Sequence, residues 1–198
     1  MPRDFVTVVS GLPRSGTSML MRMLEAGGIP ALTDGQRGAD ADNPLGYFEL
    51  EAVKNLPADA AWLEAATGKA VKVVSALLER LPAGHRYRIL FLERDLGEVL
   101  ASQRRMLERR GEPTERVRDD AMASMFRKHV AAVLERARAR SEMQVMVVRH
   151  AEVLASPAEC ARRLDDFVGG GLDVAAMAAA VDASLWRQRV SAPAAGSR

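Results

Sequence analysis

The sequence has few cysteines and no long apolar run. Cys160 is the single cysteine among 198 residues, so no disulfide can form within the chain, and a reducing compartment is the expected setting. No apolar stretch approaches the ~20 residues that a membrane-spanning helix needs. The first residues lack the apolar segment and small-residue cleavage site of a signal peptide, so we expect a cytoplasmic protein without a membrane span.

An excess of charge of one sign is also missing. The 28 basic and 26 acidic residues give a formal net charge of +2, too balanced to require nucleic acid as a partner. Hydrophobic residues make up 48% and charged residues 27%, which is ordinary for a soluble globular protein. The length suits one domain that can build its own core. We expect a single domain over residues 1–190 and a disordered tail over residues 191–198.

Short β-rich segments alternate with helical patterns along the chain. Strands are predicted at 5–10, 69–74, 88–93 and 143–148. Helices are predicted at 18–26, 47–56, 75–81, 96–110, 117–140, 156–168 and 174–181, with Ser75 and Asp95 as N-caps. The polar segment 30–46 is predicted to be a long functional loop. This alternation predicts an α/β fold, in which helices flank both faces of a central parallel β-sheet.

A glycine-rich loop follows the first predicted strand. Residues 11–18 (GLPRSGTS) lie between a strand and a helix, where a phosphate-binding loop is expected. The spacing matches the G-x-x-x-x-G-K-[ST] pattern, but Thr17 stands at the lysine position and the cation is Arg14, inside the loop. The missing lysine argues against ordinary ATP or GTP hydrolysis. The simpler alternative is a strand-to-helix turn without a ligand.

Residues 12–18 (LPRSGTS) resemble the 5′-phosphosulfate-binding loop of the sulfotransferase family. In that family a [KR]-S-G-T-[TS] loop binds the 5′-phosphate and sulfate of 3′-phosphoadenosine 5′-phosphosulfate (PAPS). The resemblance implies a three-layer, P-loop NTPase-like fold. It also implies cofactor-binding roles for Pro13, Arg14, Ser15, Gly16, Thr17 and Ser18.

A second phosphate-binding element is predicted where the third strand ends. Arg94 closes this strand and Ser102 lies eight residues later on the next helix. Both can face one anion, because ligands bind at the carboxyl ends of strands in α/β sheets. The pair resembles the family's 3′-phosphate site, although the usual Arg-Asp-Pro is Arg-Asp-Leu here. The alternatives are an ion pair of Arg94 with Asp95 or Glu98, and an ordinary helix-face hydroxyl at Ser102.

Lys72 is the first predicted catalytic residue. It lies among apolar residues of the second predicted strand, where an unpaired charge is costly. It resembles the strand lysine that contacts the bridging oxygen of the leaving group in some sulfotransferases. The alternative is a lysine that reaches water from the end of the strand.

Glu49 is the second predicted catalytic residue. It ends a Gly-Tyr-Phe-Glu segment similar to one in bacterial sulfotransferase-like sequences, and it is the predicted general base for the acceptor. Asp40, Asp42 and His150 are weaker candidates. The alternative is that Glu49 only caps a short helix or lies on its solvent-exposed face.

The resemblance extends over residues 5–168, including Glu152, Val153, Leu154 and Pro157. It implies transfer of a sulfuryl group from PAPS to a hydroxyl or amine of a small-molecule acceptor, with 3′-phosphoadenosine 5′-phosphate (PAP) as product. No metal is required if arginine and lysine supply the positive charge, and the three histidines are scattered. A homodimer is an open prediction. The alternatives are a nucleotide kinase-like P-loop phosphotransferase, which needs magnesium and a loop lysine, and a non-catalytic nucleotide-binding module.

Overall fold

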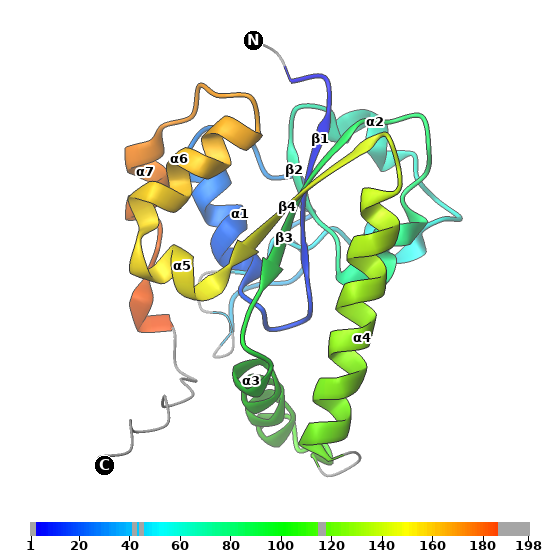
Figure 1. The fold of residues 1–198 in the computed structure, drawn as a ribbon, viewed down its shortest axis with the longest axis vertical. Coiled ribbons are helices and arrows are strands. Elements are labelled where there is room, and N and C mark those ends of the chain that lie inside the picture. Colours follow the sequence, from blue (N-terminus) through cyan, green and yellow to red (C-terminus); the bar gives the residue numbers. More distant parts are fainter. Residues whose placement is uncertain (1–2, 41–42, 44–45, 115–117, 186–198) are drawn as a thin grey trace, which may run out of the picture.

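The computed structural model describes residues 3–40, 43, 46–114 and 118–185 (Figure 1). In this part of the chain, parallel strands form one four-stranded sheet in the order β2-β1-β3-β4. The strands are β1 (Val6–Gly11), β2 (Ala70–Lys72), β3 (Tyr87–Glu93) and β4 (Met143–Arg149). The predicted tail over residues 191–198 lies outside the described residues, as does Asp42.

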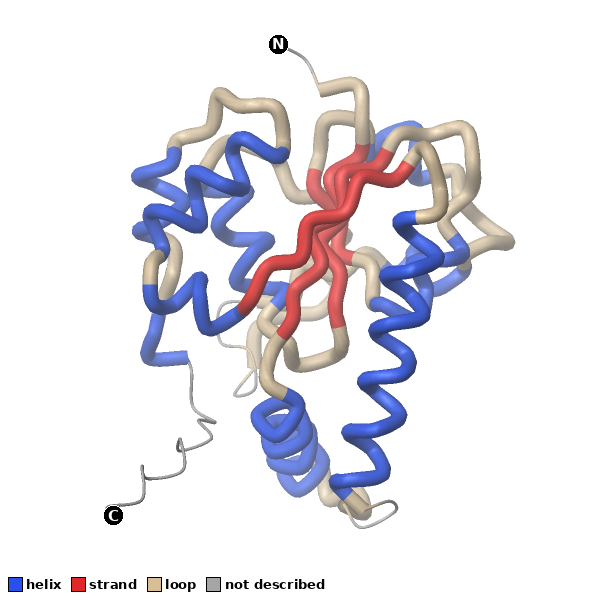
Figure 2. The backbone as a smooth tube through the Cα atoms, in the orientation of Figure 1, coloured by secondary structure: helices blue, strands red, loops and turns tan. Residues whose placement is uncertain are grey.

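Helices cover both faces of the sheet (Figures 1 and 2), which confirms the predicted α/β architecture. On one face lie α1 (Thr17–Ala26), α5 (His150–Ala155), α6 (Pro157–Phe167) and α7 (Val174–Ala179). On the other face lie η1 (Glu51–Asn55), α2 (Trp62–Ala66), η2 (Ser75–Arg80) and α4 (Asp119–Arg138). Beyond the carboxyl edge of the sheet, α3 (Leu96–Arg109) packs against α4. A short turn, η3 (Ala183–Leu185), follows α7.

The central strand β1 anchors both cores. Successive side chains of a strand point to opposite faces, so Val9 packs in the core beside α1 and Val8 in the core beside α4. All six residues of β1 are buried. Because β1 pairs with strands on both sides, the loop that starts at Gly11 leaves a fixed point at the middle of the carboxyl edge.

Local predictions failed where a tertiary partner or a short length decided the outcome. The segments predicted as helices at 47–56 and 75–81 form the 3₁₀ turns η1 and η2. Ser75 does not cap η2, because its Oγ lies 2.9 Å from Nε2 of His129. Asp95 does cap α3, accepting a hydrogen bond from the N–H of Glu98. The sequence pattern missed α2 and α5, whose five and six residues are too few to show a helical period.

None of the described helices is both long and apolar enough to cross a membrane.

Candidate functional site

The loop between β1 and α1 turns tightly, and two of its residues have left-handed backbone angles. Arg14 adopts φ +73° and Gly16 φ +100°, and the N–H of Ser15 donates to the carbonyl of Leu12 at 3.1 Å. The helix begins at Thr17 with no side-chain cap and no acidic residue in its first turn. The positive end of the helix dipole and its first N–H groups therefore suit an anion that binds inside the loop.

Two positions of the loop accept only glycine. A Cβ atom at Gly11 would lie 2.6 Å from Oγ of Ser15 and 2.7 Å from the carbonyl oxygen of Leu92. A Cβ atom at Gly16 would lie 2.7 Å from Cδ2 of His150. The loop is therefore packed against β3 and against the residue that follows β4.

A cavity of about 460 Å³ opens over this loop. Nine lysine and arginine side chains line it among the described residues, against two carboxylates, Glu49 and Asp182. The local excess of positive charge contrasts with the near-neutral chain as a whole and favours an anionic ligand.

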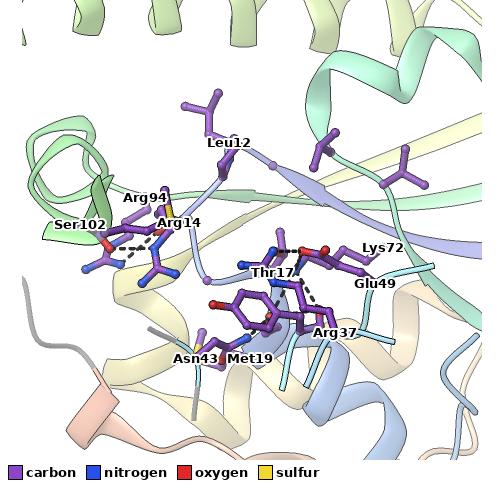
Figure 3. A pocket seen from close by; sticks show the side chains of 18 of the residues that line it. Leu12, Arg14, Thr17, Met19, Arg37, Asn43, Glu49, Lys72, Arg94 and Ser102 are labelled. Atoms are coloured by element: carbon purple, nitrogen blue, oxygen red, sulfur yellow. Dashed lines mark hydrogen bonds and ion pairs between the residues drawn. The ribbon is translucent and has the colours of Figure 1, made fainter. Parts of the chain in front are cut away.

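One end of the cavity, here the Arg94 end, joins the two predicted phosphate-binding elements. Arg14 donates from Nε to Oγ of Ser102 at 3.0 Å, and Arg94 donates from Nη1 to the carbonyl oxygen of Arg14 at 3.2 Å. Nε of Arg94 also forms an ion pair with Oε2 of Glu98 at 2.8 Å, and both side chains are more than nine-tenths buried. Figure 3 shows Arg14, Arg94 and Ser102 side by side. The Glu98 ion pair considered as an alternative is thus present, and it directs Arg94 toward the loop.

Sheet topology explains why these residues meet. In the parallel pairing of β1 with β3, Gly11 lies opposite Leu92, so the loop after Gly11 and Arg94 leave the same edge of the sheet. The Asp95 cap then starts α3 at a defined residue. Ser102 follows on the face of α3 that is turned toward the loop.

The opposite end, here the Lys72 end, centres on a buried amine. Nζ of Lys72 donates to the carbonyl oxygen of Tyr47 at 2.9 Å and to Oγ of Ser18 at 3.3 Å, and it lies 3.9 Å from Oε1 of Glu49. Its side chain is only 12% exposed. Burial lowers the pKa of Lys72 to about 8, with Glu49 opposing the shift. The lysine therefore faces the cavity and does not simply reach water.

Glu49 is tied to the long loop that precedes it. Its Oε1 accepts a hydrogen bond from Nη1 of Arg37 at 2.9 Å, and the Arg37 guanidinium lies 3.4 Å from the centre of the Tyr47 ring. The Tyr47 hydroxyl donates to the carboxylate of Asp40. Burial, followed by this hydrogen bond, raises the pKa of Tyr47. Glu49 thus lies beside Lys72, whereas Asp40 is engaged by Tyr47.

His150 lies against the loop, at Gly16. It is buried beside Gly16 and lines the cavity. Burial, followed by the charge of Arg94, lowers the pKa of His150 to about 4. The imidazole is therefore neutral at pH 7 and a weak base, which makes it a poorer general base than a group that titrates near neutrality.

Comparison with known proteins identifies the fold. Neither a protein-family model nor a curated protein matches the sequence. Several solved structures do match. A sulfotransferase domain from the curacin biosynthetic pathway has a TM-score of 0.54 at 17% identity, covering 98% of this chain and 94% of that one. The chain has the sulfotransferase fold.

Two further structures with the sulfotransferase fold support this assignment. The sulfotransferase domain of the Synechococcus PCC 7002 olefin synthase has a TM-score of 0.56 at 17% identity, covering 98% of this chain and 90% of that one. Mouse sulfotransferase SULT7A1, complexed with PAP, has a TM-score of 0.57 at 14% identity, covering 96% of this chain and 69% of that one. The fold predicted from the loop motif is confirmed.

Six cationic residues of the cavity escaped the sequence analysis, and three of them, Arg22, Arg105 and Arg37, show which signals were present or missing. Arg22 lies one helical turn beyond Ser18 on α1, and Arg105 lies one turn beyond Ser102 on α3, so helical spacing from the predicted ligands could have found both. Burial lowers the pKa of Arg22, with Asp182 opposing the shift. The third, Arg37, belongs to an irregular loop and leaves no periodic signal.

The described residues include no cluster of three or more histidine, cysteine, aspartate or glutamate side chains that is suited to a metal ion.

Proposed function

We propose that the protein is a PAPS-dependent sulfotransferase that modifies a hydroxyl or amine of a small-molecule acceptor. The observation that carries this proposal is the meeting of Arg94 and Ser102 with the loop around Arg14. Two adjacent phosphate-binding elements suit a nucleotide that carries phosphate on both its 3′ and 5′ oxygens. The PAP complex of the mouse enzyme with this fold supports the same ligand class.

The loop over residues 11–18 suits the anionic groups of such a donor. Protein atoms crowd the Cβ positions of Gly11 and Gly16, so glycine at both positions keeps the backbone in the tight loop that can wrap an anion. The buried hydroxyl of Ser15 has no hydrogen-bond partner among the described residues. A phosphate oxygen would satisfy it, as well as the uncapped first turn of α1.

The proposed chemistry is an in-line transfer. PAPS supplies an activated sulfuryl group, whose bond from sulfur to the 5′-phosphate oxygen breaks as the acceptor oxygen or nitrogen bonds to sulfur. Pro13, Arg14, Ser15, Gly16, Thr17 and Ser18 hold the 5′ end, and Arg94 with Ser102 holds the 3′-phosphate. Lys72 stays mostly protonated at pH 7 and donates a hydrogen bond to the leaving oxygen, which stabilises the negative charge that develops there.

Glu49 accepts the acceptor's proton. Its carboxylate lies on the Lys72 side of the cavity and is oriented by Arg37. A positioned base of this kind contributes about 10²–10⁴-fold to a rate. Arg37 is a positioning residue in this scheme.

Ligand-induced stabilisation tests the donor site. A ligand at 100 times its dissociation constant stabilises a protein by about 2.7 kcal/mol. We expect PAP to raise the melting temperature and magnesium-ATP to leave it unchanged, because Thr17 replaces the lysine that nucleoside triphosphate sites use. Stabilisation by magnesium-ATP alone would reject the proposal in favour of a kinase-like phosphotransferase.

A matched pair of variants then separates an enzyme from a binding module. Lys72→Met with Glu49→Gln should abolish sulfuryl transfer and retain PAP binding. Lys69→Met, which alters a lysine outside the cavity and just before β2, should keep both. A wild-type chain that binds PAP but transfers sulfuryl groups to no hydroxyl or amine would instead be a non-catalytic module.

A further inference from the structure

The cavity has an apolar wall beside Lys72. Val73 and Val74 directly follow Lys72, and Leu50, Val53 and Leu77 line the cavity with them. Val74 is 38% exposed, one of two large apolar side chains exposed among the described residues. Val53 and Val73 are buried, so Val74 is the exposed part of this apolar wall. An exposed apolar side chain that lines a cavity next to the proposed reacting group favours a ligand with an apolar body.

A row of cations reaches the same cavity from α3. Ser102 points into the cavity, since its Oγ accepts from Arg14. Arg105 and Arg109 follow at i+3 and i+7 on the same helix face and also line the cavity. At 1.5 Å per residue, the row extends about 10 Å from Ser102, beyond the proposed 3′-phosphate site.

Arg105 is the member of this row that a ligand can engage directly. Its side chain is exposed, and no described residue forms an ion pair with it. Its neighbour Arg104 instead pairs with Asp119. The cavity thus offers an apolar wall near the transfer point and an unneutralised cation farther along.

We propose that the acceptor is an amphiphilic alcohol whose apolar body packs on Val74 and whose far end carries an anionic group that binds Arg105. This inference rests on the proposed sulfotransferase function, which places the acceptor hydroxyl beside Glu49 and the leaving oxygen beside Lys72. Ser102 and Lys72 lie on opposite sides of the view in Figure 3. An acceptor that reacts near Lys72 must therefore extend across the cavity to reach Arg105, one turn beyond Ser102. A small polyol would cover neither the apolar wall nor the cation.

A matched pair of ligands tests this. In the presence of saturating PAP, 12-hydroxydodecanoic acid should bind about fivefold more tightly than its methyl ester, as expected for one exposed ion pair. With PAPS, the same ratio should appear in kcat/KM. Arg105→Ala should abolish the preference for the acid, and Arg104→Ala should preserve it. Val74→Ser should weaken acid and ester equally.

The outcomes separate this inference from the function on which it rests. If wild-type protein does not bind PAP, both fall. If PAP binds and the acid and ester bind equally, or neither binds, only the acceptor class is overturned. If Arg105→Ala weakens PAP and leaves the acid preference intact, Arg105 serves the nucleotide and the inference is likewise overturned.

Discussion

The Arg94 end and the Lys72 end of the cavity are built by different means. At the Arg94 end, the side chains come from a strand end and a capped helix, and a buried ion pair fixes the central guanidinium. At the Lys72 end, the amine is held by a main-chain carbonyl and a hydroxyl, and Glu49 is held by Arg37 from an irregular loop. The Arg94 end is thus fixed by regular structure, whereas the Lys72 end depends on contacts with a loop, where specificity usually resides.

The largest expected effect is at the Arg94 end. Arg94→Met leaves the buried carboxylate of Glu98 without this partner and should lower the free energy of unfolding by about 3–5 kcal/mol, measured with urea. Adding Glu98→Gln removes the remaining charge and should recover much of that loss. The double variant should still bind PAP about 10- to 100-fold more weakly and bind adenosine 5′-phosphate normally. Equal losses for both nucleotides would remove the 3′-phosphate role of Arg94.

The Lys72 end should respond to pH. The pKa of Lys72 is about 8 in the folded protein and about 10.5 in the unfolded chain, so the unfolded chain binds more protons between these values. The free energy of unfolding should therefore rise with pH across this window, by about 3 kcal/mol from this group. Lys72→Met should remove this rise in urea unfolding series, and Lys69→Met should keep it. The same pH dependence in both variants would contradict a buried amine.

The smallest effect isolates the fit of the loop. Gly16 and Gly28 have nearly equal φ angles of +100° and +101°, but only at Gly16 would a Cβ atom meet a neighbour within 4 Å. Alanine at either position strains the backbone, whereas Gly16→Ala also collides with His150. We expect Gly16→Ala to be less stable than Gly28→Ala by about 1–3 kcal/mol and to bind PAP more weakly in calorimetry. Equal stability and equal PAP affinity of the two variants would show that the loop can shift away from His150 at no cost.

The Arg94 end could be predicted from the sequence because it depends on local residue spacing and on the order of strands and helices. The glycine spacing specifies a loop between a strand and a helix, and Arg94 with Ser102 stands at a strand end and on the next helix. A parallel sheet brings such ends together, and this placement, together with the resemblance to the sulfotransferase family, led us to expect one site.

The Lys72 end could be predicted only in part. Lys72 stood out as a charge on an apolar strand, but its contacts with Tyr47 and Ser18 join segments 25 and 54 residues away. Arg37 acts through a ring contact and an ion pair within an irregular loop, which leaves no periodicity to detect. Contacts of this kind depend on tertiary packing and not on local pattern.

The design of the Arg94 end bears on turnover under the proposed function. Most of its contacts would be with parts of the nucleotide that PAPS and PAP have in common. Tight binding at this end therefore does not distinguish PAPS from PAP. The Lys72 end, and the part of the loop proposed to bind the sulfate, would sense whether the sulfuryl group is still attached. Departure of the spent nucleotide would then be a slow step, and its accumulation would inhibit the next cycle.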